Sequence, residues 1–117
     1  MEKKSKNKPP KCGIDYAFQR IGGKYKGRIL WRLRADTLRY GELRARIPAL
    51  SDKMLTQRLR DLEAMGLVRR RKSGGRGAPS SYAITSRAQS LRPALTALND
   101  WGEKIAKEVG ASVEPRW

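Results

Sequence analysis

Residues 50–72, LSDKMLTQRLRDLEAMGLVRRRK, contain the pattern that decides the fold. Leucines recur in this segment at the four- and three-residue spacings of a single buried helix face, at Leu55, Leu59 and Leu62. Ser51 is a favourable N-cap, and Gly66 is of the residue type that commonly follows a helix C-terminus. After Gly66 the apolar residues change to a period of about two. The segment therefore predicts a helix over residues 52–65 that leads directly into a strand.

The flanking segments extend this helix into a larger motif. Upstream, residues 40–46 predict a short helix that ends before Pro48, since proline disfavours helical geometry in the residue before it. Two helices joined by so short a turn form a helix-turn-helix. Downstream, residues 67–71 and 82–85 predict the strands of a hairpin around a segment rich in Gly, Ser and Pro. We therefore expect an α+β, mainly helical fold of the winged helix-turn-helix type.

Apolar periodicity also predicts helices in the rest of the chain. Residues 14–21 and 24–35 each carry one apolar face. Residues 86–109 carry a longer apolar stripe, and Pro93 should bend or delay the first turns of this last helix. The chain thus divides into a flexible basic arm (1–12), a winged helix-turn-helix domain that includes the last helix (13–109), and a C-terminal tail (110–117).

The composition favours an anionic partner and excludes much familiar chemistry. The 117 residues, enough for a single domain, hold 27 Lys and Arg against 11 Asp and Glu, a net charge of +16. No His and one Cys rule out an internal disulfide, a Cys/His zinc site and a Ser-His-Asp triad, and the scattered acidic residues form no carboxylate pair. No apolar run approaches the roughly 18 residues of a membrane span. We expect a cytoplasmic protein with no metal, cofactor or membrane contact, and not an enzyme.

The outer face of the central helix is the predicted DNA-reading surface. When the leucines are turned inward at about 100° per residue, Lys53, Gln57 and Arg60 point outward. Thr56 lies at their flank. Arg and Lys can bond guanine in the major groove, and Gln can pair with adenine. Ser51 caps the helix and lies where a hydroxyl can also donate to a phosphate.

The basic hairpin leaves two kinds of nucleic acid open. Arg76 lies at its tip between two glycines, which allow the tip to enter the minor groove of a duplex. The charge alone equally permits an RNA-binding or ribosome-associated module. RNA readers usually interleave aromatic and basic residues on an exposed sheet, whereas these two strands offer Tyr82 alone. Double-stranded DNA is therefore the favoured partner.

The last helix predicts association with a second copy of the chain. It carries four basic and three acidic residues, so it is nearly neutral, whereas the positive charge belongs to the preceding two thirds. Its apolar stripe, partly at heptad spacing, consists of Leu91, Leu95, Leu98, Trp101 and Ile105. A small monomer does not need to expose that much apolar surface. We therefore expect this helix to form a homodimer.

The order of these motifs resembles the HxlR family of winged helix-turn-helix transcriptional regulators, relatives of the MarR type. The matching positions are Cys12, 21–25 (IGGKY), 38–43 (LRYGEL), 50–63, 66–70, 82–85 (YAIT), 91–93 (LRP) and Trp101. The family commonly has Pro after its N-terminal cysteine, where this chain has Gly13. The resemblance implies a cytoplasmic homodimer that binds a pseudo-palindromic operator and represses or activates nearby genes.

Two features predict a response to an effector. Several regulators of this family use a cysteine at the place of Cys12 to sense oxidants or electrophiles, so the resemblance implies a thiol sensor. Cys12 also lies between a Lys-rich arm and a helix N-terminus, where positive charge favours the reactive thiolate. The alternative is a small thiol packed beside Ile14 and Phe18. Five aromatic residues line either a small-molecule pocket or the core, namely Tyr16, Phe18, Tyr25, Trp31 and Trp101.

Overall fold

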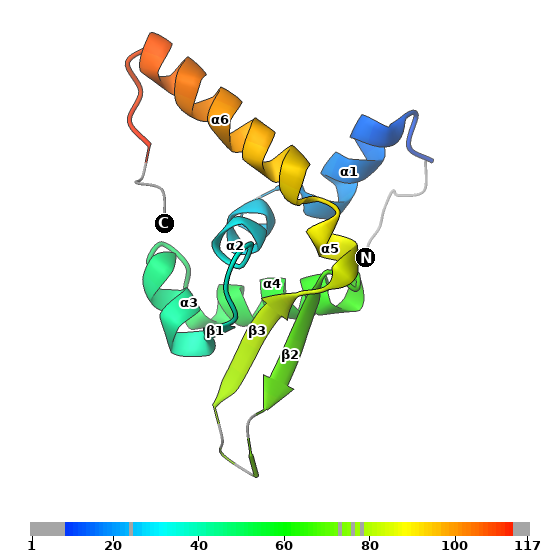
Figure 1. Ribbon diagram of the computed structural model, residues 1–117, viewed down its shortest axis with the longest axis vertical. Helices are drawn as coiled ribbons and strands as arrows, with labels where there is room; N and C mark the ends of the chain where they lie inside the picture. The colour runs from blue at the N-terminus through cyan, green and yellow to red at the C-terminus, as the bar shows by residue number, and fades with distance from the viewer. Residues whose placement is uncertain (1–8, 24, 73, 76, 78, 114–117) are drawn as a thin grey trace.

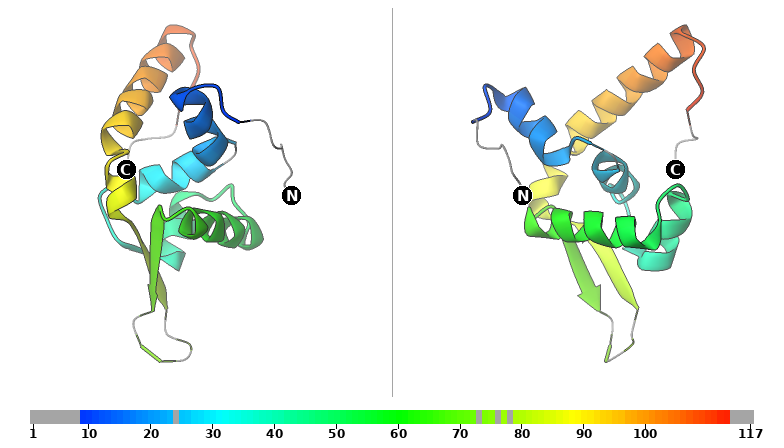
Figure 2. Two further views of the ribbon diagram at one scale, coloured as in Figure 1. Left: turned by 90° about the vertical axis from the view of Figure 1, so that its right-hand side faces the viewer. Right: turned by 180° about the vertical axis from the view of Figure 1, so that it is seen from behind.

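The computed structural model describes residues 9–23, 25–72, 74, 75, 77 and 79–113. Its elements are α1 (Gly13–Ile21), α2 (Lys26–Arg32), β1 (Leu38–Arg39), α3 (Tyr40–Arg46), α4 (Asp52–Ala64), β2 (Val68–Lys72), β3 (Ser80–Ile84), α5 (Ser86–Gln89) and α6 (Arg92–Glu108). The β2–β3 hairpin projects from one end of the molecule, while α1 and α6 diverge from the other (Figure 1 and Figure 2). This arrangement confirms the winged helix-turn-helix fold.

The leucine stripe of α4 forms the centre of the core. Leu55, Leu59 and Leu62 are buried, and α4 packs against α2 and β2. The other most deeply buried side chains come from α2 and the residue that follows it, from α3 and from the loop before α4, and are Ile29, Leu30, Leu33, Leu43, Ile47 and Leu50. Burial of one such side chain contributes roughly 1.5–3 kcal/mol. The rotation of α4 about its own axis is therefore fixed by the core.

The strands form an antiparallel sheet in the order β1-β3-β2. Val68 pairs with Ile84 and Arg70 pairs with Tyr82. Val68, Tyr82 and Ile84 are buried, so this face of the sheet is the one that covers the core. The sequence pattern does not predict β1, which pairs Leu38 with Tyr82, because alternation cannot show in a strand of two residues.

Two of the predicted helices differ from the observed ones by more than a single terminal residue. The helix predicted at 24–35 spans only Lys26–Arg32, because Tyr25 has a φ of 79°, a left-handed conformation outside the helical region, and Leu33 leaves it at the other end. The helix predicted at 86–109 is divided into α5 and α6 by a turn at residues 90–91. Pro93 lies in the first turn of α6, where the missing N–H has no cost.

The C-terminal turn of α4, residues 65–67, is hydrogen-bonded to α5. Gly66 has a φ of 74°, which ends the helix in the left-handed conformation that glycine adopts readily. Thr85, whose side chain also caps α5, donates from its hydroxyl to the Gly66 carbonyl at 2.6 Å. Arg87 Nη1 donates to the Met65 carbonyl at 3.0 Å. The end of α4 and the start of α5 therefore form one joint.

Helices α1 and α6 leave apolar side chains uncovered within the subunit. No residue of α1 is buried, and Ile14 and Phe18 are 68% and 59% exposed. On α6, Leu98 and Trp101 are 52% and 62% exposed. Within the described part of the chain, no helix has the length and apolar character needed to cross a membrane.

Candidate nucleic-acid interface

The outer face of α4 carries the residues expected to read bases. Lys53, Gln57 and Arg60 are exposed, and Thr56 is half-buried at their flank. In the right-hand view of Figure 2, α4 runs across the front of the molecule with the β2–β3 hairpin below it. Ser51 accepts a hydrogen bond at Oγ from Met54 N at 3.1 Å, which confirms its role as N-cap.

Gln57 is held along the helix by an acidic neighbour. Its Nε2 donates to Asp61 Oδ1 at 3.0 Å, and Arg58 Nη1 lies 3.5 Å from the other oxygen, Asp61 Oδ2. The Gln57 amide therefore has a defined orientation before any base approaches. Nε2 can therefore contact a base only if it gives up its bond to Asp61 or donates its second N–H to the base.

The first turn of α4 is joined to α3 by a cluster that sequence analysis missed. The Tyr40 hydroxyl donates to Asp52 Oδ1 at 3.0 Å, and Arg44 Nε donates to the same oxygen at 3.0 Å. The Tyr40 hydroxyl also lies 3.5 Å from Thr56 Oγ1. The bond from Tyr40, followed by that from Arg44, lowers the pKa of Asp52 from its usual 3.8. These partners lie on different helices, so no sequence period indicated them.

The hairpin adds a basic residue beside α4. Since Val68 is buried, alternation places Arg70 on the α4 side of the sheet and Arg69 on the other side. Arg70 lines a cavity of about 250 Å³ together with Arg60, and donates from Nε to Ser80 Oγ at 3.0 Å. The buried position of Val68 is the signal that could have identified Arg70. Arg76, the residue predicted at the hairpin tip, lies outside the described residues.

The residues predicted for dimerisation do not all face the same way. Leu98 and Trp101 form the open part of the α6 stripe, and Ile105 is half-buried beside them. Leu95 is 9% exposed and belongs to the core of its own subunit, with Leu91 packed against that core. The solvent-exposed part of the apolar stripe on α6 is therefore narrower than the sequence period suggests.

Cys12 lies at the N-cap of α1 with its side chain exposed. Its carbonyl accepts the bond from Tyr16 N at 3.0 Å that begins the helix. Within one subunit the thiol is therefore not buried beside Ile14 and Phe18, which are themselves largely exposed.

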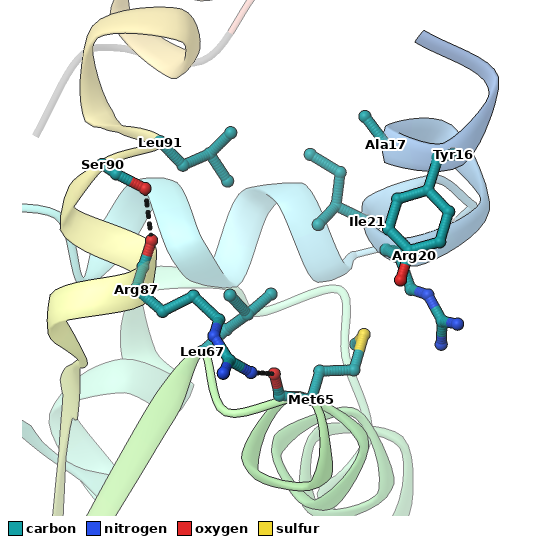
Figure 3. A pocket seen from close by; sticks show the side chains of 9 residues that line it. All are labelled: Tyr16, Ala17, Arg20, Ile21, Met65, Leu67, Arg87, Ser90 and Leu91. Atoms are coloured by element: carbon teal, nitrogen blue, oxygen red, sulfur yellow. Dashed lines mark hydrogen bonds between the residues drawn. The ribbon is translucent and has the colours of Figure 1, made fainter. Parts of the chain in front are cut away.

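The five aromatic residues do not converge on one pocket. Tyr16 lines a cavity between α1, α5 and the end of α4 (Figure 3), whereas Trp31 lines a separate one between α2 and α6. The Arg34 guanidinium stacks over the Trp31 ring at 3.6 Å. Trp101 is exposed on α6. The alternative of one pocket lined by all five aromatic residues is therefore not assembled within one subunit, whereas Tyr25 and Trp31 pack against the core as the other alternative expected.

A helix-turn-helix with a polar outer face on its second helix, followed by a basic antiparallel hairpin, defines a winged helix-turn-helix DNA-binding protein. The chain belongs to the HxlR-like helix-turn-helix family, whose model matches residues 20–109. It is thus a transcriptional regulator of the helix-turn-helix class.

Individual relatives agree with this assignment over most of the chain. YkvN of Bacillus subtilis, an HTH-type transcriptional regulator, is 39% identical over 103 residues, which cover 88% of this chain and 87% of YkvN. An HTH-type transcriptional regulator of Methanothermobacter thermautotrophicus is 37% identical over 92 residues, covering 79% of this chain and 70% of the relative. The solved structure of the redox regulator HypR in its reduced form has a TM-score of 0.78 at 30% identity, covering 84% of this chain and 96% of HypR.

We predict that Tyr40→Phe raises the pKa of Asp52 toward 3.8, because the Tyr40 bond is the largest cause of the low value. An NMR titration of the Asp52 carboxyl carbon measures this change. A carboxyl whose pKa is depressed in the folded state stabilises the fold above its unfolded-state pKa of about 3.9, and this stabilisation is lost as pH falls through the folded value. Acid should therefore destabilise Tyr40→Phe less than wild type. Tyr16→Phe, in α1, is the control; an unchanged Asp52 titration in Tyr40→Phe contradicts the prediction.

Proposed function

We propose that this helix-turn-helix regulator binds a pseudo-palindromic operator in double-stranded DNA as a homodimer, with α4 of each subunit in a major groove. The observation that carries this proposal is the polar face on α4, at Lys53, Gln57 and Arg60, which burial of the leucine stripe turns outward. The net charge of +16 adds a sequence-independent attraction to phosphates.

The polar face of α4 divides into base readers and backbone contacts. Arg60 and Lys53 suit the O6 and N7 acceptors of guanine, and Gln57 suits adenine once its amide is shared between Asp61 and the base. Ser51 and Thr56 lie near the first turn of α4, where hydroxyls donate to phosphates. Each bidentate base contact contributes roughly 1–3 kcal/mol of discrimination.

The hairpin is the proposed anchor to the DNA backbone. Arg70 lines the same cavity as Arg60, so both side chains approach one surface of the domain. Its guanidinium suits the phosphates between the groove that α4 occupies and the adjoining minor groove. From the sequence, Arg76 is assigned a similar part at the hairpin tip.

The exposed faces of α1 and α6 are the proposed dimer interface. Both helices extend from the end of the molecule opposite the hairpin (Figure 1), so pairing there leaves α4 and the hairpin open to DNA. The exposed apolar residues available include Ile14 and Phe18 on α1 and Leu98 and Trp101 on α6. A two-fold dimer built on them presents two copies of α4 to two half-sites.

Cys12 is the proposed sensor of oxidants or electrophiles. The thiol is exposed at the start of α1, beside the proposed interface, so its modification changes surface that a partner subunit would contact. HypR, similar to this chain, is a redox regulator whose structure has been solved in oxidised and reduced forms. Oxidation is expected to shift α1 against the partner and thereby alter the spacing of the two α4 helices.

The first experiment is selection of bound sequences from random duplex DNA. Wild type should select a palindromic motif, whereas Gln57→Ala or Arg60→Ala should lose preference at particular base pairs, by about 1–3 kcal/mol each. Arg70→Ala and Arg76→Ala should weaken cognate and random DNA alike and reduce the salt slope, by about 0.9 for each phosphate that the variant no longer neutralises. Lys104→Ala, on α6, is the control. Equal weakening on cognate and random DNA for all four variants contradicts base reading by α4, and preference for RNA over duplex DNA contradicts the partner.

The dimer interface is tested by adding charge to one face of α6. Leu98→Asp together with Ile105→Asp should halve the mass measured by light scattering, because two carboxylates enter an apolar interface. Operator affinity should fall with it. Thr96→Asp lies on the opposite side of α6 at about 100° per residue and should leave the mass unchanged. A dimer that survives the double substitution places the interface elsewhere.

The sensor role is tested with diamide, which oxidises pairs of thiols to disulfides. Operator binding by wild type should change on treatment and recover with dithiothreitol, while Cys12→Ser should not respond. Non-reducing electrophoresis shows whether the two subunits become linked. A response that persists in Cys12→Ser, or no response in either protein, removes Cys12 as the sensor.

A further inference from the structure

The face of the sheet that points away from α4 carries arginines from both of its edge strands. Alternation along β2 places Arg69 and Arg71 on this outer face, since Val68 is buried on the other one. In β1, Leu38 is buried and Arg39 is exposed, which places Arg39 on the outer face as well. In Figure 1 the outer face is turned toward the viewer and α4 lies behind the hairpin. These three cations are therefore not part of the surface that α4 presents.

The central strand, β3, leaves room between these arginines. Arg71 on β2 and Arg39 on β1 both pair with Ser81, which lies between them. One row further along, Arg69 pairs with Ala83. Side chains this small leave a depression of about 60 Å³, which is lined by Thr37, Arg69, Arg71, Ser81 and Ala83 and is named the outer arginine site below. Because one water occupies about 30 Å³ in the liquid, the depression admits a single phosphate or carboxylate group but no aromatic ring.

The outer arginine site has donors that the rest of the subunit does not use. In the part of the chain that the structure describes, neither Arg69 nor Arg71 has a carboxylate partner. Ser81 Oγ donates to the Arg71 carbonyl at the long distance of 3.4 Å, so this hydroxyl is only weakly engaged. Two cations on one face of a strand repel each other, and an anion between them removes that repulsion. The site therefore suits an oxyanion, which accepts hydrogen bonds from guanidinium and hydroxyl groups together.

We propose that the outer arginine site binds a phosphate of the DNA backbone, on the strand opposite to the one that Arg70 contacts. Arg70 lies on the α4 side of the same hairpin, so the hairpin carries cations on both faces. A sheet with its side chains is about 10 Å thick, so a hairpin that stands on a minor groove reaches the phosphates on both of its borders. This inference rests on the proposed binding of duplex DNA and adds the second strand to it.

The position of the hairpin favours a phosphate on DNA over other oxyanions. In the right-hand view of Figure 2 the hairpin extends below α4, so a duplex held by α4 has its backbone close to both faces of the hairpin. Phosphates on that duplex are present at a high effective concentration, because their binding is intramolecular once α4 is bound. A free phosphate ion or the carboxylates of an acidic peptide lack this advantage.

The test replaces single phosphates of a selected operator with uncharged methylphosphonates, one position on one strand at a time. For wild type, affinity should fall at least about threefold at positions on both strands that face each other across one minor groove. Arg69→Gln together with Arg71→Gln should abolish the sensitivity on one strand, and Arg70→Gln should abolish that on the other. The control, Arg92→Gln together with Lys104→Gln, removes two cations from α6 and should keep both sensitivities.

A second variant keeps the arginines and fills the site instead. The carboxylate introduced by Ser81→Glu pairs with the neighbouring guanidinium groups, so thermal unfolding should show a fold at least as stable as wild type. Operator affinity should nevertheless fall at least about threefold, and the salt slope should decrease by about 0.9 for the phosphate that is lost. Ser81→Gln is similar in size but uncharged, and should weaken binding less.

The results distinguish failure of the site from failure of the proposed function. Sensitive phosphates on one strand only, or unchanged sensitivity after substitution of Arg69 and Arg71, overturns the site and leaves the operator. Failure to bind any duplex refutes the proposed function and the site with it. Calorimetry with inorganic phosphate and with poly-L-glutamate tests the other occupants. If Ser81→Glu abolishes binding of either probe but leaves operator affinity unchanged, the site belongs to that anion and the assignment to DNA is overturned.

Discussion

Burial of the leucine stripe on α4 is the constraint on which the rest of the molecule depends. Through this stripe, α4 packs against α2 and β2, and the packing fixes the rotation of α4 about its own axis. That rotation decides which side chains face outward, because side chains on a helix keep fixed directions relative to one another. Truncation of one buried leucine lowers the free energy of unfolding by about 2–5 kcal/mol. It also removes part of the packing that fixes the rotation of α4.

The features that sequence predicted are those with a regular period or a local capping signal. Local sequence signals identified three features of α4, namely its buried face, its N-cap at Ser51 and its end at Gly66. The bond between Tyr40 and Asp52 was not, because it joins different helices. The limits of α2 were also missed, since they follow from the backbone conformation of Tyr25 rather than from apolar spacing.

The sequence also did not predict which apolar side chains of α1 and α6 the rest of the subunit covers. The stripe on α6 was predicted as one surface, yet Leu95 faces the core while Leu98 and Trp101 face solvent. A heptad count assigns these residues to one side, whereas the neighbours of the helix decide which part of that side is covered. The exposed face of α1 is a similar case, because amphipathicity alone does not say what covers a helix.

A rotation of α6 about the turn at residues 90–91 produces a displacement that grows along the length of the helix. Its 17 residues span about 25 Å at about 1.5 Å per residue. A rotation of about 5° at the base of a rod of that length displaces its far end by about 2 Å, more than half of the roughly 3.4 Å rise of one base pair. Small changes in the bonds of this turn, such as that from Ser90 Oγ to the Arg87 carbonyl at 2.6 Å, are therefore magnified into shifts of about 2 Å at the far end of α6.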